Sequence, residues 1–131
     1  MLPESDRRYL EDKGLEFDVQ AEGGMLCVVI NEFPLPSGYS SDSVDLLLRL
    51  PPGYPDAAPD MFWCDPPVLF ANGAVPPASE LRETYLGRQW QRFSRHLPQG
   101  VWRPGVDGLQ SYLALLHTML EREAHPAARA A

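Results

Sequence analysis

Hydrophobic positions recur with a helical period near the two ends of this chain. The clearest helix is predicted over residues 106–123, where apolar residues return at steps of three and four. Its expected buried face consists of Val106, Leu109, Leu113, Leu116 and Leu120, and it is widened by Tyr112, Leu115 and Met119. An earlier helix is predicted over residues 3–14, because Pro3 suits a first turn and Gly14 suits the end.

Between these helices the pattern changes to one that is typical of strands. Residues 16–21 and 25–32 flank a pair of glycines, which indicates a hairpin. Residues 43–50 place four apolar side chains on one face, and residues 61–64 form a short fourth apolar run. A helix, a meander and a second helix predict an α+β domain with a four-stranded antiparallel sheet.

The middle of the chain predicts little regular structure. Residues 65–79 hold four prolines, one glycine and one asparagine, which indicates an irregular crossing segment. Residues 80–86 are expected to form one or two helical turns. Residues 1–124 are expected to make a single domain, and residues 125–131, which are small and contain a proline, a flexible C-terminal tail.

Composition narrows the classes of function. The chain has 131 residues, of which 44% are hydrophobic and 22% charged, as in globular domains. No apolar run is long enough to cross a bilayer and the first residues lack a signal-peptide core, so a cytoplasmic protein without a membrane partner is expected. A net charge of −7 argues against nucleic acid as a partner. Two cysteines and three scattered histidines have no metal-ligand spacing, so neither a metal nor a cofactor is expected.

Two motifs carry a resemblance to a known superfamily. Tyr54, Pro55 and Pro59 form a rigid turn directly after a predicted strand, and its ring can pack against the domain. Trp102 and Pro104 open the long helix as a Trp-x-Pro motif. Both motifs, in this order of elements, resemble the ubiquitin-conjugating-enzyme (UBC) superfamily, whose fold is therefore expected over residues 3–123. The stretches around residues 90–96 and 102–109 resemble more narrowly the bacterial UBC-like group called prokaryotic family E.

The resemblance assigns the reactive position to a serine. In typical members the tryptophan follows the active-site cysteine by eight residues, and here that position holds Ser94. The region that would carry a His-Pro-Asn motif reads Thr84 to Arg88, so the asparagine that steadies the oxyanion is missing or replaced. The protein is therefore either a non-catalytic variant or one that works through an oxyester.

A base for Ser94 is available two residues further along. Serine is a poor nucleophile unless a base takes its proton. In an extended segment Ser94 and His96 leave the chain on the same side, so a neutral imidazole could serve as the general base. The alternative is a polar loop pair without chemistry. Cys64 is the rival nucleophile, but its place beside an acid in an apolar run favours packing.

Basic and aromatic residues surround this pair. No acidic residue lies within residues 84–106, which contain Arg88, Arg92, Arg95 and Arg103. Together with Trp102, these arginines are candidates to bind a C-terminal carboxylate or an acidic partner. They could equally be surface residues stacked on Trp90 and Trp102.

The resemblance implies acyl transfer as the leading function. The chain would accept a ubiquitin-like protein from an activating enzyme, as an oxyester on Ser94 in place of the usual cysteine thioester. The alternative is a non-catalytic UBC variant or an RWD-type binding module, which holds a ubiquitin-like protein or scaffolds its partners.

Overall fold

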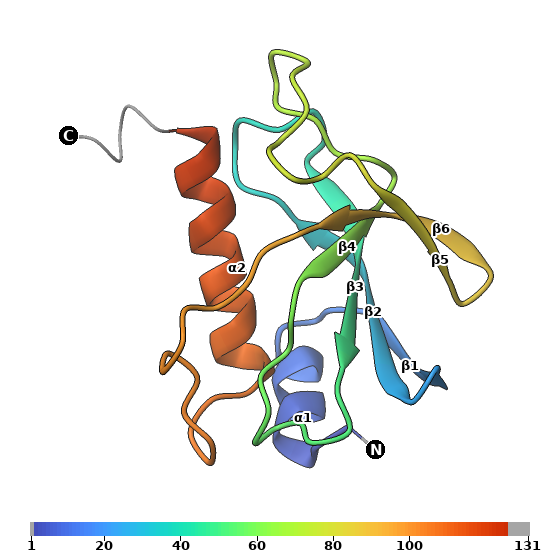
Figure 1. The fold of residues 1–131 in the computed structure, drawn as a ribbon, viewed down its shortest axis with the longest axis vertical. Coiled ribbons are helices and arrows are strands. Elements are labelled where there is room, and N and C mark those ends of the chain that lie inside the picture. The colour runs from blue at the N-terminus through green and yellow to red at the C-terminus, as the bar shows by residue number, and fades with distance from the viewer. Residues whose placement is uncertain (1, 126–131) are drawn as a thin grey trace.

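The computed structural model describes residues 2–125, which form two helices and six strands (Figure 1). In chain order the elements are α1 (Glu4–Asp12), β1 (Phe17–Glu22), β2 (Met25–Pro34), β3 (Ser43–Leu50), β4 (Phe62–Asp65), β5 (Arg82–Tyr85), β6 (Arg88–Phe93) and α2 (Leu109–Ala124). The α+β class and the order of helix, meander and helix are as predicted. Residues 126–131, which hold all but one residue of the expected tail, lie outside the described residues.

The strands form one antiparallel sheet in the order β1-β2-β3-β4-β6-β5. The first four strands match the predicted meander, but the prediction of only four strands is wrong. Residues 80–86, expected to be helical, contain β5 instead. Tyr85 pairs with Arg88, which leaves Leu86 and Gly87 as a two-residue turn. Both have positive φ angles, 56° and 69°, as a tight hairpin turn requires. A leucine in the first turn position hid this hairpin in the sequence.

Both helices contribute to the core on one face of the sheet. Figure 1 shows α2 running along one side of the sheet, with α1 near its N-terminal end. This main core includes Leu10 of α1, Ile30, Leu46 and Phe62 of the sheet, and Leu109, Leu113, Leu116 and Leu120 of α2. Helix packing of this kind is how an amphipathic helix and a sheet bury their apolar faces together.

Helix α2 begins three residues later than predicted. Val106, expected on the buried face, is 67% exposed and lies before the helix. Gly105 takes a left-handed conformation with a φ of 80°, and the Arg103 amide donates to the Asp107 carboxylate. This turn keeps the chain out of the helix until Leu109. The other four residues of the predicted apolar stripe are buried.

A second, smaller core lies on the opposite face of the sheet. It consists of Cys27, Val29, Leu47, Trp63 and Trp90, and Met61, Tyr85 and Leu86 pack against it. The sheet curls so that the turn of the β5–β6 hairpin meets β1, and the Leu86 amide donates to the Glu22 carboxylate at 3.0 Å. The guanidinium of Arg49 stacks on the Tyr85 ring at 3.9 Å. Burial on both faces explains why β2 and β3 read as nearly continuous apolar runs.

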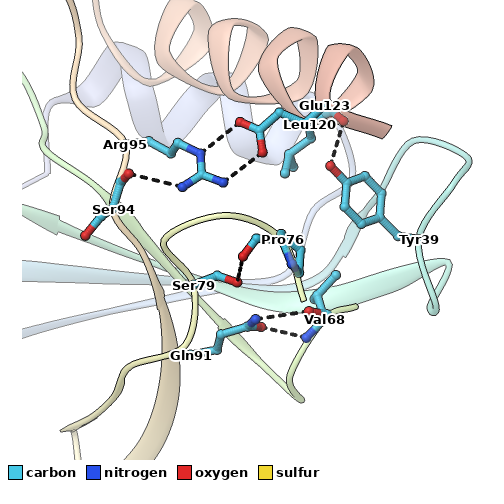
Figure 2. A network of polar contacts seen from close by, with 9 residues as sticks. All are labelled: Tyr39, Val68, Pro76, Ser79, Gln91, Ser94, Arg95, Leu120 and Glu123. Atoms are coloured by element: carbon cyan, nitrogen blue, oxygen red, sulfur yellow. Dashed lines mark hydrogen bonds and ion pairs between the residues drawn. The ribbon is translucent and has the colours of Figure 1, made fainter. Parts of the chain in front are cut away.

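The crossing segment between β4 and β5 is irregular, as predicted, and buried side chains hold it in place. The Gln91 amide accepts from the Val68 N–H at 2.6 Å and donates to the Val68 carbonyl at 3.0 Å (Figure 2). At the far end of α2, His125 contacts the Ser37 hydroxyl at 3.1 Å, so this first residue of the expected tail packs on the domain. Within residues 2–125, no helix is long and apolar enough to cross a membrane.

Candidate functional site

The Tyr54–Pro55 turn packs against the start of both helices. The Tyr54 hydroxyl donates to Asp6 Oδ2 at 2.6 Å, and its ring centroid lies 6.2 Å from that of Trp102. The Trp102 indole N–H donates to the Pro55 carbonyl at 2.8 Å. Burial and the contact with Asp6 raise the pKa of Tyr54 above its usual range, so this hydroxyl remains a donor. The two motifs quoted for the resemblance are thus in direct contact. Pro59 is buried and Pro104 is exposed.

Asp6 is a structural residue that the sequence analysis missed. Its side chain is buried, and Oδ1 accepts from the Leu109 N–H at 3.0 Å, at the start of α2. A Cβ at Gly108 would lie 2.8 Å from the same oxygen, so glycine is needed for this close approach. In the sequence Asp6 is one of several acids in the first turn of a helix, and nothing there distinguishes it.

Ser94 follows the last residue of β6 and is half-buried. Its N–H donates to the Ala78 carbonyl at 3.0 Å, and its carbonyl accepts from Arg95 at 3.1 Å. The hydroxyl donates to the Met61 sulfur at 3.7 Å. Figure 2 shows the hydroxyl pointing away from α2, while the carbonyl faces the Arg95 side chain. In this conformation Met61, and not His96, is the partner of the Ser94 hydroxyl.

His96 is paired with a carboxylate that the sequence analysis also missed. Its Nδ1 lies 2.6 Å from Asp60 Oδ1, and both side chains are exposed. Because an ionised carboxylate can only accept, Nδ1 carries the proton in the neutral imidazole, and Nε2 is then the proton acceptor. The pairing of β4 with β6 brings Asp60 here, since Phe62 pairs with Phe93 and the Met61 N–H donates to the Arg95 carbonyl at 3.0 Å. Only the strand pairing could reveal this neighbour.

Each of the four arginines near Ser94 forms an ion pair with an acidic side chain. For three of them the acid lies on another helix or strand, and for Arg103 it lies in the same loop. The pairs are Arg88 with Asp45 and Asp65, Arg92 with Glu83 at 3.0 Å, Arg95 with Glu123 at 2.7 Å, and Arg103 with Asp107 at 3.5 Å. Arg88 also stacks on the Trp90 ring at 4.4 Å. The surface around Ser94 therefore carries less positive charge than the stretch without acids suggested.

Cys64 is 2% exposed and lies in the main core. Burial, helped by the charge of Asp65, raises the pKa of its thiol above the usual range, which disfavours the thiolate. Its surroundings favour the packing role expected from the sequence. Within residues 2–125, no cluster of three or more His, Cys, Asp or Glu side chains could hold a metal ion.

A groove of about 420 Å³ runs beside His96, between α2 and the segment that follows β6. Its walls include His96, Leu97 and Pro98 on one side, and Leu115 and Met119 of α2 on the other. The candidate site thus has a half-buried hydroxyl, an oriented imidazole and an adjoining apolar groove.

These elements, with the Tyr-Pro turn joined to a Trp-x-Pro loop, are consistent with an E2-like fold, that of the ubiquitin-conjugating proteins. The family model described as prokaryotic E2 family E matches residues 2–123, and the chain belongs to this family. The resemblance found in the sequence is therefore confirmed. No curated protein and no solved structure matches the chain. At the level of the family, membership connects the chain with ubiquitin-like protein conjugation, and so with a ubiquitin-like protein and its activating enzyme.

Proposed function

We propose that this chain accepts a ubiquitin-like protein from an activating enzyme, with the Ser94 hydroxyl as acceptor and His96 as general base. The observation that carries the proposal is the 2.6 Å contact between Asp60 and His96. A carboxylate that holds Nδ1–H leaves Nε2 free to take a proton, as in other activated serines. His96 follows Ser94 by two residues, in the exposed segment after β6, and this short spacing supports its assignment as the base.

The proposed step balances without any further reactant. The Ser94 oxygen attacks the carbonyl carbon of the thioester that joins the ubiquitin-like protein to the activating enzyme. The new C–O bond forms as the C–S bond breaks, and His96 Nε2 takes the hydroxyl proton. The imidazole then gives that proton to the departing thiolate. The product is an oxyester on Ser94.

One rearrangement must precede this step. The Ser94 hydroxyl, which now donates to the Met61 sulfur, must turn toward His96. The cost is small, because a thioether sulfur is a weak acceptor. Serine χ1 wells interconvert readily at half-exposed positions.

The same Ser94–Met61 contact favours a second function, that of a binding module without chemistry. In that case the hydroxyl is a structural donor at the end of β6, and the groove beside α2 serves partner binding alone. The two functions differ in whether a covalent adduct forms with the activating enzyme and its ubiquitin-like protein.

A charging assay separates the two functions. Incubation with the cognate activating enzyme, ATP and the ubiquitin-like protein should give an adduct that resists thiol reductant and is cleaved by hydroxylamine. Ser94→Ala should abolish the adduct, whereas Ser5→Ala, a change at an exposed serine of α1, should leave it intact. Tight binding of the partners without an adduct would establish the binding module instead.

His96→Ala tests the assigned base in the same assay. Loss of a general base should slow formation of the adduct about 100-fold or more. A rate within about twofold of the wild-type rate would remove His96 from the mechanism. Normal charging of the Ser94→Ala variant would show that Ser94 is not the acceptor.

A further inference from the structure

Met61 holds an unusual backbone conformation at the centre of the candidate site. Its φ is 61°, in the left-handed region that a side chain with a Cβ rarely adopts. A residue keeps such a conformation only where the surrounding structure imposes it.

Two hydrogen bonds fix both backbone groups of Met61. Its N–H donates to the Arg95 carbonyl at 3.0 Å, which ties it to the segment after β6. Its carbonyl accepts from the Tyr112 hydroxyl at 2.8 Å, which ties it to α2. Burial, together with the nearby charge of Asp60, raises the pKa of Tyr112 above its usual range, so this hydroxyl stays protonated and donates.

This fixed turn sets the positions of both partners of the site. The side chain of Met61 meets the Ser94 hydroxyl, and the preceding residue, Asp60, meets His96. The Tyr112 ring in turn lies edge-on to Trp102, with ring centroids 6.4 Å apart. The tryptophan of the Trp-x-Pro loop is thus linked to the site through Tyr112.

We infer that Tyr112 is a positioning residue, whose hydroxyl holds the Asp60–Met61 turn and thereby the orientation of His96 and Ser94. Its role in transfer rests on the proposed function of Ser94. The role of Tyr112 in orienting His96 is independent of that function and can be measured without any partner protein.

Tyr112→Phe removes the hydroxyl and keeps the ring. The matched control is Tyr39→Phe, because the Tyr39 hydroxyl also donates to a backbone carbonyl of the same region, that of Leu120 on α2, at 2.6 Å (Figure 2). Each variant loses one hydrogen bond from a tyrosine hydroxyl to a backbone carbonyl, buried for Tyr39 and partly buried for Tyr112. Only Tyr112 touches the turn that carries Asp60.

Nitrogen NMR shifts of the neutral His96 imidazole give the first readout. Wild type and Tyr39→Phe should hold the proton on Nδ1, as the contact with Asp60 requires. Tyr112→Phe should shift the population toward the tautomer protonated on Nε2, as should Asp60→Ala, which removes the partner outright. The proposal is overturned if Tyr112→Phe keeps the wild-type tautomer.

The charging rate gives the second readout. Tyr112→Phe should slow adduct formation about 10- to 100-fold through misplacement of the base, and Tyr39→Phe by less than about twofold. Equal slowing by both variants would mean a general loss of packing and would contradict the positioning role in transfer. If wild type forms no adduct but the tautomer shifts in Tyr112→Phe, the acceptor function fails while the positioning of His96 stands.

Discussion

The Asp6 carboxylate joins three parts of the molecule. It extends from α1, accepts the Tyr54 hydroxyl of the Tyr-Pro turn through one oxygen, and accepts the first amide of α2 through the other. The amides of a first helical turn have no partners within the helix, so Asp6 supplies from a distance what a capping side chain supplies locally. The residue is 5% exposed, and water cannot easily replace it.

Asp6→Ala should therefore destabilise the fold strongly for a change of this size. The Tyr54 hydroxyl and the Leu109 amide would both lose their acceptor in a buried place, which should lower the free energy of unfolding by about 2–4 kcal/mol. Urea denaturation followed by circular dichroism measures this loss. Ser5→Ala, at an exposed neighbour on α1, should change stability by less than about 0.5 kcal/mol. Equal changes in the free energy of unfolding for the two variants would show that the Asp6 carboxylate does not stabilise the contact between these elements.

Glu83 makes stability depend on pH. Burial acts to raise its pKa, but hydrogen bonds from Trp63 and Tyr85 and the charge of Arg92 outweigh it and lower the pKa below the ordinary value of 4.5. The folded protein thus keeps this carboxylate charged at a lower pH than the unfolded chain does. The stabilisation is complete above the ordinary value and is lost as the pH falls through the folded value.

Glu83→Gln should lower the free energy of unfolding by about 1–2 kcal/mol at neutral pH, since a charged acceptor is replaced by a neutral one. The difference from wild type should narrow as the pH falls below 4.5, because a protonated carboxyl resembles the amide. A series of denaturation curves across acidic pH tests this. Glu80→Gln, at an exposed side chain, is the control. A difference that stays constant with pH would contradict the assigned role of the charge.

At the scale of elements, α2 could be predicted and the β5–β6 hairpin could not. Helix α2 is predictable because its buried residues recur at helical spacing. Only the predicted start is wrong, where Gly105 and Gly108 interrupt the pattern. The hairpin is short, and its turn of Leu86 and Gly87 lacks the usual asparagine or aspartate. Its burial also depends on the curl of the sheet, which brings Leu86 to Glu22 across the molecule. The local pattern of hydrophobic and polar residues does not indicate a contact between residues so far apart in the sequence.

The inward face of α2 yields a direct test of the predicted stripe. Leu113 is 4% exposed and Leu115 is 40% exposed, although they are two residues apart on the same helix. Leu113→Ala should lower the free energy of unfolding by about 2–5 kcal/mol, because it leaves a cavity in the main core. Leu115→Ala should cost less than about 1 kcal/mol. Chemical denaturation of both variants checks the assignment, and a reversed order would mean that the helix faces the other way.

At the scale of the whole molecule, the candidate site is assembled from distant parts of the chain. The sequence predicts Ser94 from its spacing to Trp102 in the family motif, and His96 from its place two residues after Ser94. Asp60 and Tyr112 were not found, because strand pairing and the packing of α2 bring them to the site. The packing of the elements also supplies acids to Arg88, Arg92 and Arg95, although residues 84–106 contain none. The assignment of the chemistry to Ser94 and His96 stays a prediction from the sequence, and the fold shows what surrounds these two residues.

The central claim is that Ser94 is the acceptor, and the linkage formed by Ser94→Cys tests it most directly. Both native cysteines are buried, so a cysteine at position 94 would be the accessible thiol within residues 2–125. Charged with the cognate activating enzyme and ATP, wild type should give an adduct that survives thiol reductant. Ser94→Cys should give one that reductant releases, because the new linkage is a thioester. The cysteine thiol also needs less help from a base than the serine hydroxyl does. A Ser94→Cys adduct that still resists reductant would place the acceptor elsewhere and contradict the account.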